Sequence, residues 1–263
     1  MPKAFSRTAL CLSALILSGP ALARGWDDFT PREPSSKQSG HREWQWDGND
    51  GLSIHAPAIV HYVPTGPARI VINGPEEMLD HLRVGQGRIE MECFDCHFDR
   101  SALDITVSGV TLHHVAIGGS SEIRLGRLDQ DRLDLTISGS GHASAQGRMD
   151  ELGVTVSGSG GAELDAADVH QADIHISGSG SVHAGGRIDQ MKLAISGSGQ
   201  AGLDHAAIRQ ADIHISGNGN ANLSPRDEAN VVITGSGRVA MAAKPARLSE
   251  SVTGSGHVRI GSE

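Results

Sequence analysis

A short turn motif recurs through the second half of the chain at nearly constant spacing. The sequence Ser-Gly-Ser-Gly, or a close variant, begins at Ser138, Ser157, Ser177, Ser196, Ser216, Thr234 and Thr253. Successive copies lie 18 to 20 residues apart. Self-similarity at such a period indicates a solenoid, in which every repeat is one coil that stacks on its neighbours.

Apolar and polar residues alternate on both sides of this motif. The position just before the motif is aliphatic in every coil, and so is the position two residues after its last glycine. The two columns are Ile137, Val156, Ile176, Ile195, Ile215, Ile233 and Val252, and Ala143, Ala162, Val182, Ala201, Ala221, Val239 and Val258. A period of two on either side of a Gly-rich corner predicts strand, bend, strand. A third apolar column supplies a further side of each coil and consists of Leu128, Met149, Val169, Ile188 and Ile208.

The repeats therefore predict the fold class. One coil cannot bury its apolar side alone, so the coils must stack, at about 4.8 Å per coil. We expect an all-β, single-stranded, right-handed parallel β-helix with about 19–20 residues per coil. The hand follows from the strong preference of parallel crossovers. End coils need protection, and Glu250, which interrupts an apolar column, fits a terminal coil.

The first residues have the pattern of an export signal. Lys3 and Arg7 precede a short apolar run at residues 9–17, and Ala21 and Ala23 mark a small-residue cleavage site. The apolar run is shorter than the roughly 20 residues of a membrane-spanning helix. We therefore expect a signal peptide at residues 1–23 and an exported mature chain, periplasmic or secreted, without a membrane span.

Composition divides the rest of the chain. Residues 24–42 are polar and contain Pro31 and Pro34, which predicts a flexible linker. Residues 43–100 contain short alternating runs and predict an N-terminal β segment that caps the stack. Within it we expect a hairpin around residues 47–51 and a helical turn in residues 75–82. The repeats occupy residues 101–263, and residues 43–263 are expected to form one folded unit.

The ladder of turn motifs also resembles a known family. Together with the lead-in ITVSGVTLHHVAIGGSSEIRL at residues 105–125, it is similar to the putative autotransporter adhesin head domain, or GIN domain, over residues 56–260. The resemblance implies an exported β-helical module of bacterial envelopes with no established catalytic residues. It transfers no site residue to this chain.

Cys93 and Cys96 form a C-x-x-C-H pattern with His97. This pattern can attach haem covalently, and an exported chain could use that chemistry. The surroundings are strand-like, however, and the aromatic-free repeats offer little of the large apolar pocket that haem needs. We expect a disulfide between Cys93 and Cys96 in an oxidising compartment, with free or metal-bound thiols and a haem or redox protein as alternatives.

The histidines do not predict a metal site. His175 and His214 share one column, but Ala194 lies between them, so their backbones are about 9.6 Å apart. That distance is too long for easy sharing of one ion. Calcium binding of the β-roll type needs Asp two residues after the turn, where every coil has Ala or Val. We expect no metal and no cofactor.

A carboxylate column raises the question of catalysis. Asp173, Lys192 and Asp212 occupy one column, and two carboxylates at this separation could serve an inverting glycosidase. Lys192 between them would lower both pKa values, whereas an acid catalyst needs one pKa raised. We therefore expect an ion-pair ladder and no catalytic residues, and a polysaccharide-acting enzyme remains the alternative.

Binding is the function that the repeats favour. A polar column on the predicted outer face forms a candidate ligand-facing ladder, made of His142, Ser181, Gln200, Asn220, Arg238 and His257. Like residues at like positions suit an extended ligand, which gains avidity from several weak contacts. A cell-surface glycan or an envelope protein is the expected partner. The formal net charge of −9 and the lack of basic clusters argue against nucleic acid.

Overall fold

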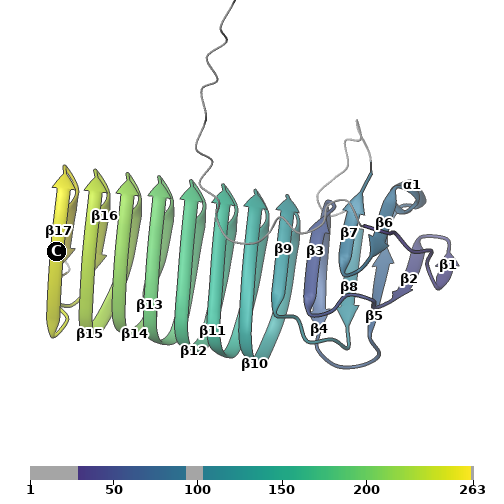
Figure 1. Cartoon of the computed structure of the whole chain (residues 1–263), viewed down its shortest axis with the longest axis horizontal. Helices are drawn as coiled ribbons and strands as arrows, with labels where there is room; N and C mark the ends of the chain where they lie inside the picture. The colour runs from purple at the N-terminus through teal and green to yellow at the C-terminus, as the bar shows by residue number, and fades with distance from the viewer. Residues whose placement is uncertain (1–28, 93–102, 262–263) are drawn as a thin grey trace, which may run out of the picture.

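The computed structural model describes residues 29–92 and 103–261. These residues form an all-β structure, a β-helix of about seven turns preceded by a region of mixed sheet. Figure 1 shows the coils side by side in a long flat stack, with the N-terminal region at one end and the last coil at the other. The predicted fold class is confirmed.

Each coil of the repeat region is one long strand that bends back on itself. These strands are β10 (Glu122–Gly139), β11 (His142–Gly158), β12 (Gly161–Gly178), β13 (Ser181–Gly197), β14 (Gln200–Gly217) and β15 (Asn220–Gly235). Consecutive strands pair in parallel, and the predicted columns are in register, with Val156 opposite both Ile137 and Ile176. The period of the motif is therefore the length of one coil.

Every coil contributes to two sheets. The segment after a turn motif, such as residues 142–145, belongs to what we call the post-turn sheet. The segment before the next motif, such as residues 151–158, belongs to the pre-turn sheet. Between the two segments the strand pairing shifts register, for example between Ala145 and Gly147, and there the chain bends.

The turn motif needs glycine for a reason of space as well as backbone conformation. Gly158 has a φ of +114°, which side-chain-bearing residues rarely adopt. An added Cβ would lie 2.6 Å from the carbonyl oxygen of Gly139 in the preceding coil. That same oxygen accepts a hydrogen bond of 2.8 Å from the backbone of Ser159. Close stacking of successive turns therefore depends on this glycine.

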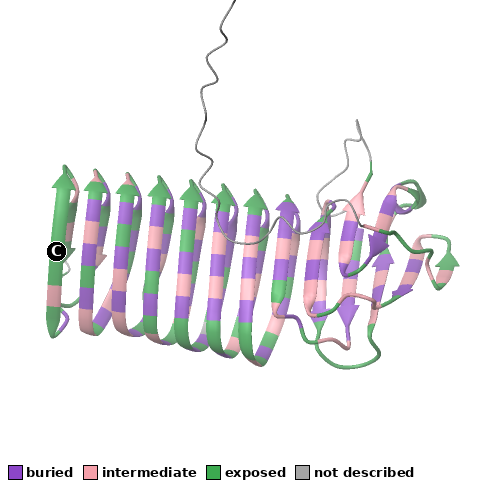
Figure 2. Ribbon diagram, viewed as in Figure 1, coloured by how far each residue is buried: buried purple, intermediate pink, exposed green. Residues whose placement is uncertain are grey.

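The predicted apolar columns form the core between the two sheets. Ile137, Val156, Ile176, Ile195 and their equivalents are at most 2% exposed through β15. Figure 2 shows buried and solvent-facing residues alternating along the coils from β10 to β15, whereas β17 (Arg247–Gly254) at the end of the stack is mostly exposed. Because no aromatic residue follows Phe98, the repeat core consists of aliphatic side chains and methionine.

The N-terminal region extends both sheets with non-repeating strands. The post-turn sheet continues through β4 (Ala58–Val63), β8 (Leu103–Ser108), β5 (Arg69–Asn73), β2 (His41–Gln45) and β1 (Ser36–Gln38). The pre-turn sheet continues through β9 (His114–Gly119), β3 (Gly51–His55), β7 (Arg88–Met91) and β6 (Leu82–Gly85). This mixed region covers the end of the stack, as expected for a capping segment.

Local expectations for this region have mixed outcomes. The helical turn is confirmed as α1 (Glu76–Asp80). The hairpin around residues 47–51 is wrong, because β2 pairs with β1 and β5 in the post-turn sheet, whereas β3 pairs with β7 and β9 in the pre-turn sheet. The chain at residues 47–51 thus passes from one sheet to the other. The expected linker at residues 24–42 differs at its end, where β1 and the start of β2 are strands.

A buried arginine connects the outermost strands to α1. Arg42 on β2 is 2% exposed. It donates hydrogen bonds to the backbone carbonyl of Gln38 and to the carboxylates of Glu76 and Asp80. The hydrogen bond to Glu76 raises the pKa of Arg42 above its ordinary value, so the guanidinium stays charged. Arg42 therefore holds the capping strands and the helix together.

Among the described residues, no comparable strand or helix covers the other end of the stack. There β16 (Arg238–Met241) and β17 (Arg247–Gly254) both pair with β15, and β18 (His257–Ile260) pairs with β16 as the start of a further coil. Val252 and Ile260 are each 39% exposed, although their equivalents in earlier coils are buried. Glu250 stands in the apolar column opposite Val231, as expected for a terminal coil.

Candidate functional site

The predicted ladder lies on the outer face of the post-turn sheet. Its residues pair in register from coil to coil, with Gly161 between His142 and Ser181. Ser181 is half-buried and the other five ladder residues are exposed. The structure thus brings all six together in one column, and their role as ligand contacts stays a prediction.

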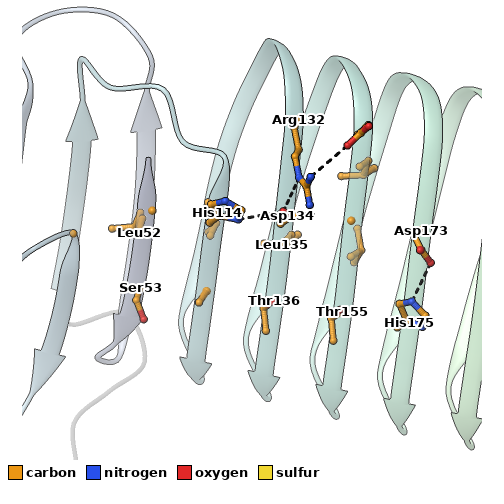
Figure 3. Close-up of a pocket in the computed structure, with 18 of the residues that line it drawn as sticks. Leu52, Ser53, His114, Arg132, Asp134, Leu135, Thr136, Thr155, Asp173 and His175 are labelled. Atoms are coloured by element: carbon orange, nitrogen blue, oxygen red, sulfur yellow. Dashed lines mark hydrogen bonds and ion pairs between the residues drawn. The ribbon is translucent and has the colours of Figure 1, made fainter. Parts of the chain in front are cut away.

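A groove lies on the opposite outer face, that of the pre-turn sheet. It has a volume of about 790 Å³ and crosses β7, β3, β9, β10, β11 and β12. Figure 3 shows polar side chains from several coils pointing into it. The groove therefore spans the junction between the N-terminal region and the repeats.

Small residues form the shallow part of this groove. One outward column runs from Ser53 through Ala116, Thr136 and Thr155 and ends at the larger His175. In the neighbouring column Gly153 lies opposite Asp134 on one side and Asp173 on the other. Strand alternation sends these residues outward because Leu152 and Val154 point into the core. The missing side chain at Gly153 leaves a notch between two carboxylates.

Arg132 and His114 orient the first of these carboxylates. Arg132 Nε donates to Asp134 Oδ2 at 2.8 Å, and His114 Nδ1 lies 3.1 Å from the same oxygen. Arg132 also pairs with Glu151 at 3.5 Å. The hydrogen bond to Asp134 raises the pKa of Arg132, so its positive charge persists. Figure 3 shows this network at one side of the groove.

The second carboxylate belongs to the column considered for catalysis. Asp173 lies 3.0 Å from His175 Nε2, and Asp212 lies 3.6 Å from His214 Nδ1, in each case on its own coil. Asp212 also accepts a hydrogen bond of 3.2 Å from Asn230. These contacts differ from the expected ladder, in which Lys192 would be the partner of both carboxylates. Both carboxylates therefore make polar contacts with neighbouring side chains on the sheet surface.

Other expected features fall partly outside the described residues. Cys93, Cys96 and the expected signal peptide lie outside the described residues. Across residues 29–92 and 103–261, no group of three or more His, Cys, Asp or Glu residues is arranged to hold a metal ion. Nor does this described part contain a helix long and apolar enough to cross a membrane.

Sequence reasoning did not identify the groove. The sequence places Asp173 in a polar column, and the structure continues this column back through Gly153 to Asp134. The available signal was the loss of a side chain at Gly153 in a column that is otherwise polar. The contribution of β3 and β7 had no signal of this kind, because their neighbours are set by tertiary structure.

The profile of a known family matches most of the chain. Its description is "Putative auto-transporter adhesin, head GIN domain", and it aligns with residues 50–167 and 148–245. The chain belongs to this family. The resemblance seen in the turn motifs is therefore confirmed, and the GIN-domain match includes every groove residue from Gly51 to His175.

Three solved structures resemble this GIN-domain chain. A putative lipid binding protein from Parabacteroides distasonis ATCC 8503 has a TM-score of 0.76 at 18% identity and covers 84% of this chain and 96% of its own. A putative adhesin from Parabacteroides merdae ATCC 43184 has a TM-score of 0.74 at 16% identity, with coverages of 84% and 95%. A putative adhesin from Bacteroides fragilis NCTC 9343 has a TM-score of 0.61 at 16% identity, with coverages of 87% and 99%.

At these identities the structural likeness shows the fold. The names of the three proteins describe adhesins or a binding protein, and none of the three names an enzyme. A comparison with curated proteins finds no match.

Proposed function

We propose that this chain is an exported module of the bacterial envelope that binds an extended partner, a glycan or a protein. Binding would use polar side chains on the outer faces of the β-helix. The ladder on the post-turn sheet and the groove on the pre-turn sheet are the two candidate surfaces. Membership in a family described as an adhesin head, and the absence of enzyme names among the three similar structures, support binding over catalysis.

The observation that carries this proposal is the register of the polar columns. Gln200, Asn220 and Arg238 lie directly opposite one another on successive coils and are exposed. Such a column repeats a contact at about 4.8 Å intervals. A ligand that reaches several coils adds weak contacts into a useful affinity.

The test is binding of the mature chain to a glycan array and to envelope proteins identified by mass spectrometry. Joint replacement of Gln200, Asn220 and Arg238 by Ala should weaken binding if the ladder is the contact surface. The matched control replaces Arg148, Asp168 and Arg187 by Ala, which form an exposed column of three coils at the bend. Binding that survives the ladder change locates the contact on the other face, and the absence of any glycan or protein ligand contradicts the function.

Export and the disulfide are proposed with the same function. Cleavage after Ala23 would deliver the chain to an oxidising compartment, where Cys93 and Cys96 would form a disulfide. Intact-mass measurement of the protein from the periplasm or medium should give a chain that begins at Arg24 and lacks two hydrogens. A mass increment the size of haem would instead support the redox alternative.

A further inference from the structure

We infer that the groove on the pre-turn sheet binds a neutral, hydroxyl-rich glycan chain, with the notch at Gly153 as its central contact. This inference rests on the proposed function and adds to it the site and the ligand class. It favours the groove over the ladder as the glycan-binding surface.

Gly153 is a glycine whose backbone does not require one. Its φ lies outside the left-handed region, in contrast to the turn glycine Gly158 at +114°. An added Cβ at Gly153 would lie 2.5 Å from Asp134 Oδ1, the end of a flexible side chain. The space that a side chain would fill at Gly153 is therefore taken by the carboxylate oxygen of Asp134, which leans over the strand into the groove.

The neighbouring side chains hold that oxygen in place. Arg132 and His114 both contact Asp134 Oδ2, so Oδ1 is the oxygen directed over Gly153. On the opposite side of the notch His175 holds Asp173 in a similar way. Ionised carboxylates only accept hydrogen bonds, and bonds to charged acceptors are the stronger ones. Two fixed acceptors on either side of a notch suit the hydroxyl groups of a sugar.

The charges that line the groove favour a neutral ligand over an anionic one. Asp134, Glu151 and Asp173 line the groove, and the two lining arginines, Arg132 and Arg88, already pair with carboxylates. A phosphate or an acidic headgroup would meet more negative than positive charge. Such a mismatch opposes binding, so a neutral ligand fits the groove better.

The surface and strand pairing of the groove also favour a glycan over a lipid or a peptide as the ligand. Within the described residues the exposed large apolar side chains are Val63, Val252 and Ile260, and none of them lines the groove. An acyl chain that followed the groove would also have to cover the charged side chains of Asp134, Glu151 and Asp173, and burial of charges opposes its binding. A peptide added as a strand needs an open sheet edge, whereas β9 to β12 are paired on both sides. A hydroxyl-rich chain that follows the groove across several coils meets neither obstacle.

The experiment is affinity electrophoresis, which measures how far the mature chain is retarded in gels that contain starch, dextran, mannan, xylan or mixed-linkage β-glucan. The wild-type chain should be retarded by at least one of these neutral polysaccharides. Gly153→Ala should weaken that interaction by about tenfold or more, because the methyl group fills the notch and displaces a charged acceptor. Asp134→Asn, which keeps the shape and removes the charge, should weaken it in the same direction.

Gly202→Ala is the matched control on the opposite outer face. Gly202 is half-buried like Gly153, its φ also lies outside the left-handed region, and an added Cβ would meet His183 Nδ1 at 2.5 Å. This variant should bind within about twofold of wild type, since surface changes away from a site have small effects. Thermal melting of both glycine variants should match wild type, which separates loss of the site from loss of the fold.

The outcomes distinguish this inference from the proposed function. Retardation that Gly153→Ala and Asp134→Asn leave unchanged overturns the groove site, while the envelope-binding function stands. Binding only to an identified protein or to phosphatidylglycerol vesicles overturns the glycan class. If no polysaccharide, protein or vesicle binds the wild-type chain, both the inference and the proposed function fail.

Discussion

In the repeat region, equivalent buried positions hold the same kind of small aliphatic residue from coil to coil, whereas the N-terminal region buries Trp44, Tyr62 and the charged Arg42. The repeats need only local register, because each coil pairs with the coil before and the coil after it. The N-terminal strands pair across longer stretches of chain, as β2 does with β5. Stability in the first region is therefore spread over many like contacts, and in the second it depends on a few particular side chains.

The two ends of the stack express the same difference. At the N-terminal end Arg42, Glu76 and Asp80 tie strands to a helix over the sheet. At the other end β17 leaves Val252 partly exposed and places Glu250 in an apolar column. An inward-pointing charge on an edge strand discourages pairing with another chain. Strands and a helix cover the N-terminal end of the stack, whereas the charge of Glu250 protects the edge strand at the other end.

The largest expected effect is the loss of a repeat core position. Ile195→Asp places an unpaired charge at a site that is 1% exposed and should lower the free energy of unfolding by at least about 3 kcal/mol. Gln200→Asp, five residues later on the outer face, should change it by about 0.5 kcal/mol or less. Urea denaturation of the two variants measures both values. Equal destabilisation would contradict the assignment of inward and outward columns.

Removal of Arg42 should act on one region only. Arg42→Ala leaves the carbonyl of Gln38 and two carboxylates without their shared donor, so β1 and β2 should open more often. Hydrogen exchange in these strands should become about tenfold faster or more, while β12 to β14 keep their protection. Arg226→Ala is the control, because the Arg226 side chain is 78% exposed and, among the described residues, pairs with its neighbour Asp227 alone. Uniformly faster exchange along the whole chain would show that the regions are not separable.

Acid should weaken the N-terminal region through a single group. The hydrogen bond from Arg42 lowers the pKa of Glu76 below its ordinary value of 4.5. A pKa that is lower in the folded state than in the unfolded state stabilises the fold at pH values above the ordinary pKa. This stabilisation disappears as the pH falls through the folded-state pKa. Protection of the β1 and β2 amides, measured relative to the intrinsic exchange rate at each pH, should therefore fall as the pH drops below about 4.5, and Glu76→Gln should remove this dependence. Asp189→Asn is the control in the repeats, because His170 and Arg187 also lower the pKa of Asp189. This variant should leave the acid response of β1 and β2 unchanged. If Glu76→Gln left the acid response of β1 and β2 intact, the response would have another source.

The smallest effect on stability is expected at the open end. Glu250→Val restores an apolar column on an edge strand and should change the free energy of unfolding by less than about 1 kcal/mol. It should instead promote association of chains, because the inward charge no longer blocks edge pairing. Sedimentation velocity at increasing concentration measures this, with Ser249→Val, the adjacent outward position, as the control. A monomeric Glu250→Val variant at all concentrations would show that the charge does not protect the edge.

The repeat columns were predictable because every coil places equivalent residues at the same distance from its turn motif. Ile195 could be assigned to the core from Ile176 and Ile215, whose positions relative to the turn are identical. In the N-terminal region the run at residues 43–46 has no second copy, and alternation alone favours pairing with the nearest run, at residues 51–55. In the structure β2 pairs with β1 and with β5, and β5 lies beyond β3 and β4 in the chain. Such pairing depends on tertiary packing that alternation does not encode.

The candidate site was only partly predictable for a related reason. The ladder from His142 to His257 could be read from side chains that are present. The groove depends on a side chain that is absent at Gly153 and on strands β3 and β7 brought alongside β9. Its carboxylate network also depends on rotamers of Arg132 and His114, which spacing alone does not specify.

The one-sided pairing of the last coil has a mechanical consequence. Tension applied at the C-terminal end would act first on β17 and β18, whose hydrogen bonds join them to the stack along one edge. Once this coil detaches, the next becomes the exposed edge, so the stack would unzip coil by coil instead of failing at once. Each step would release about 19 residues, or roughly 65 Å of extended chain. A module of this design would absorb a pull in equal increments and keep its more distant coils folded.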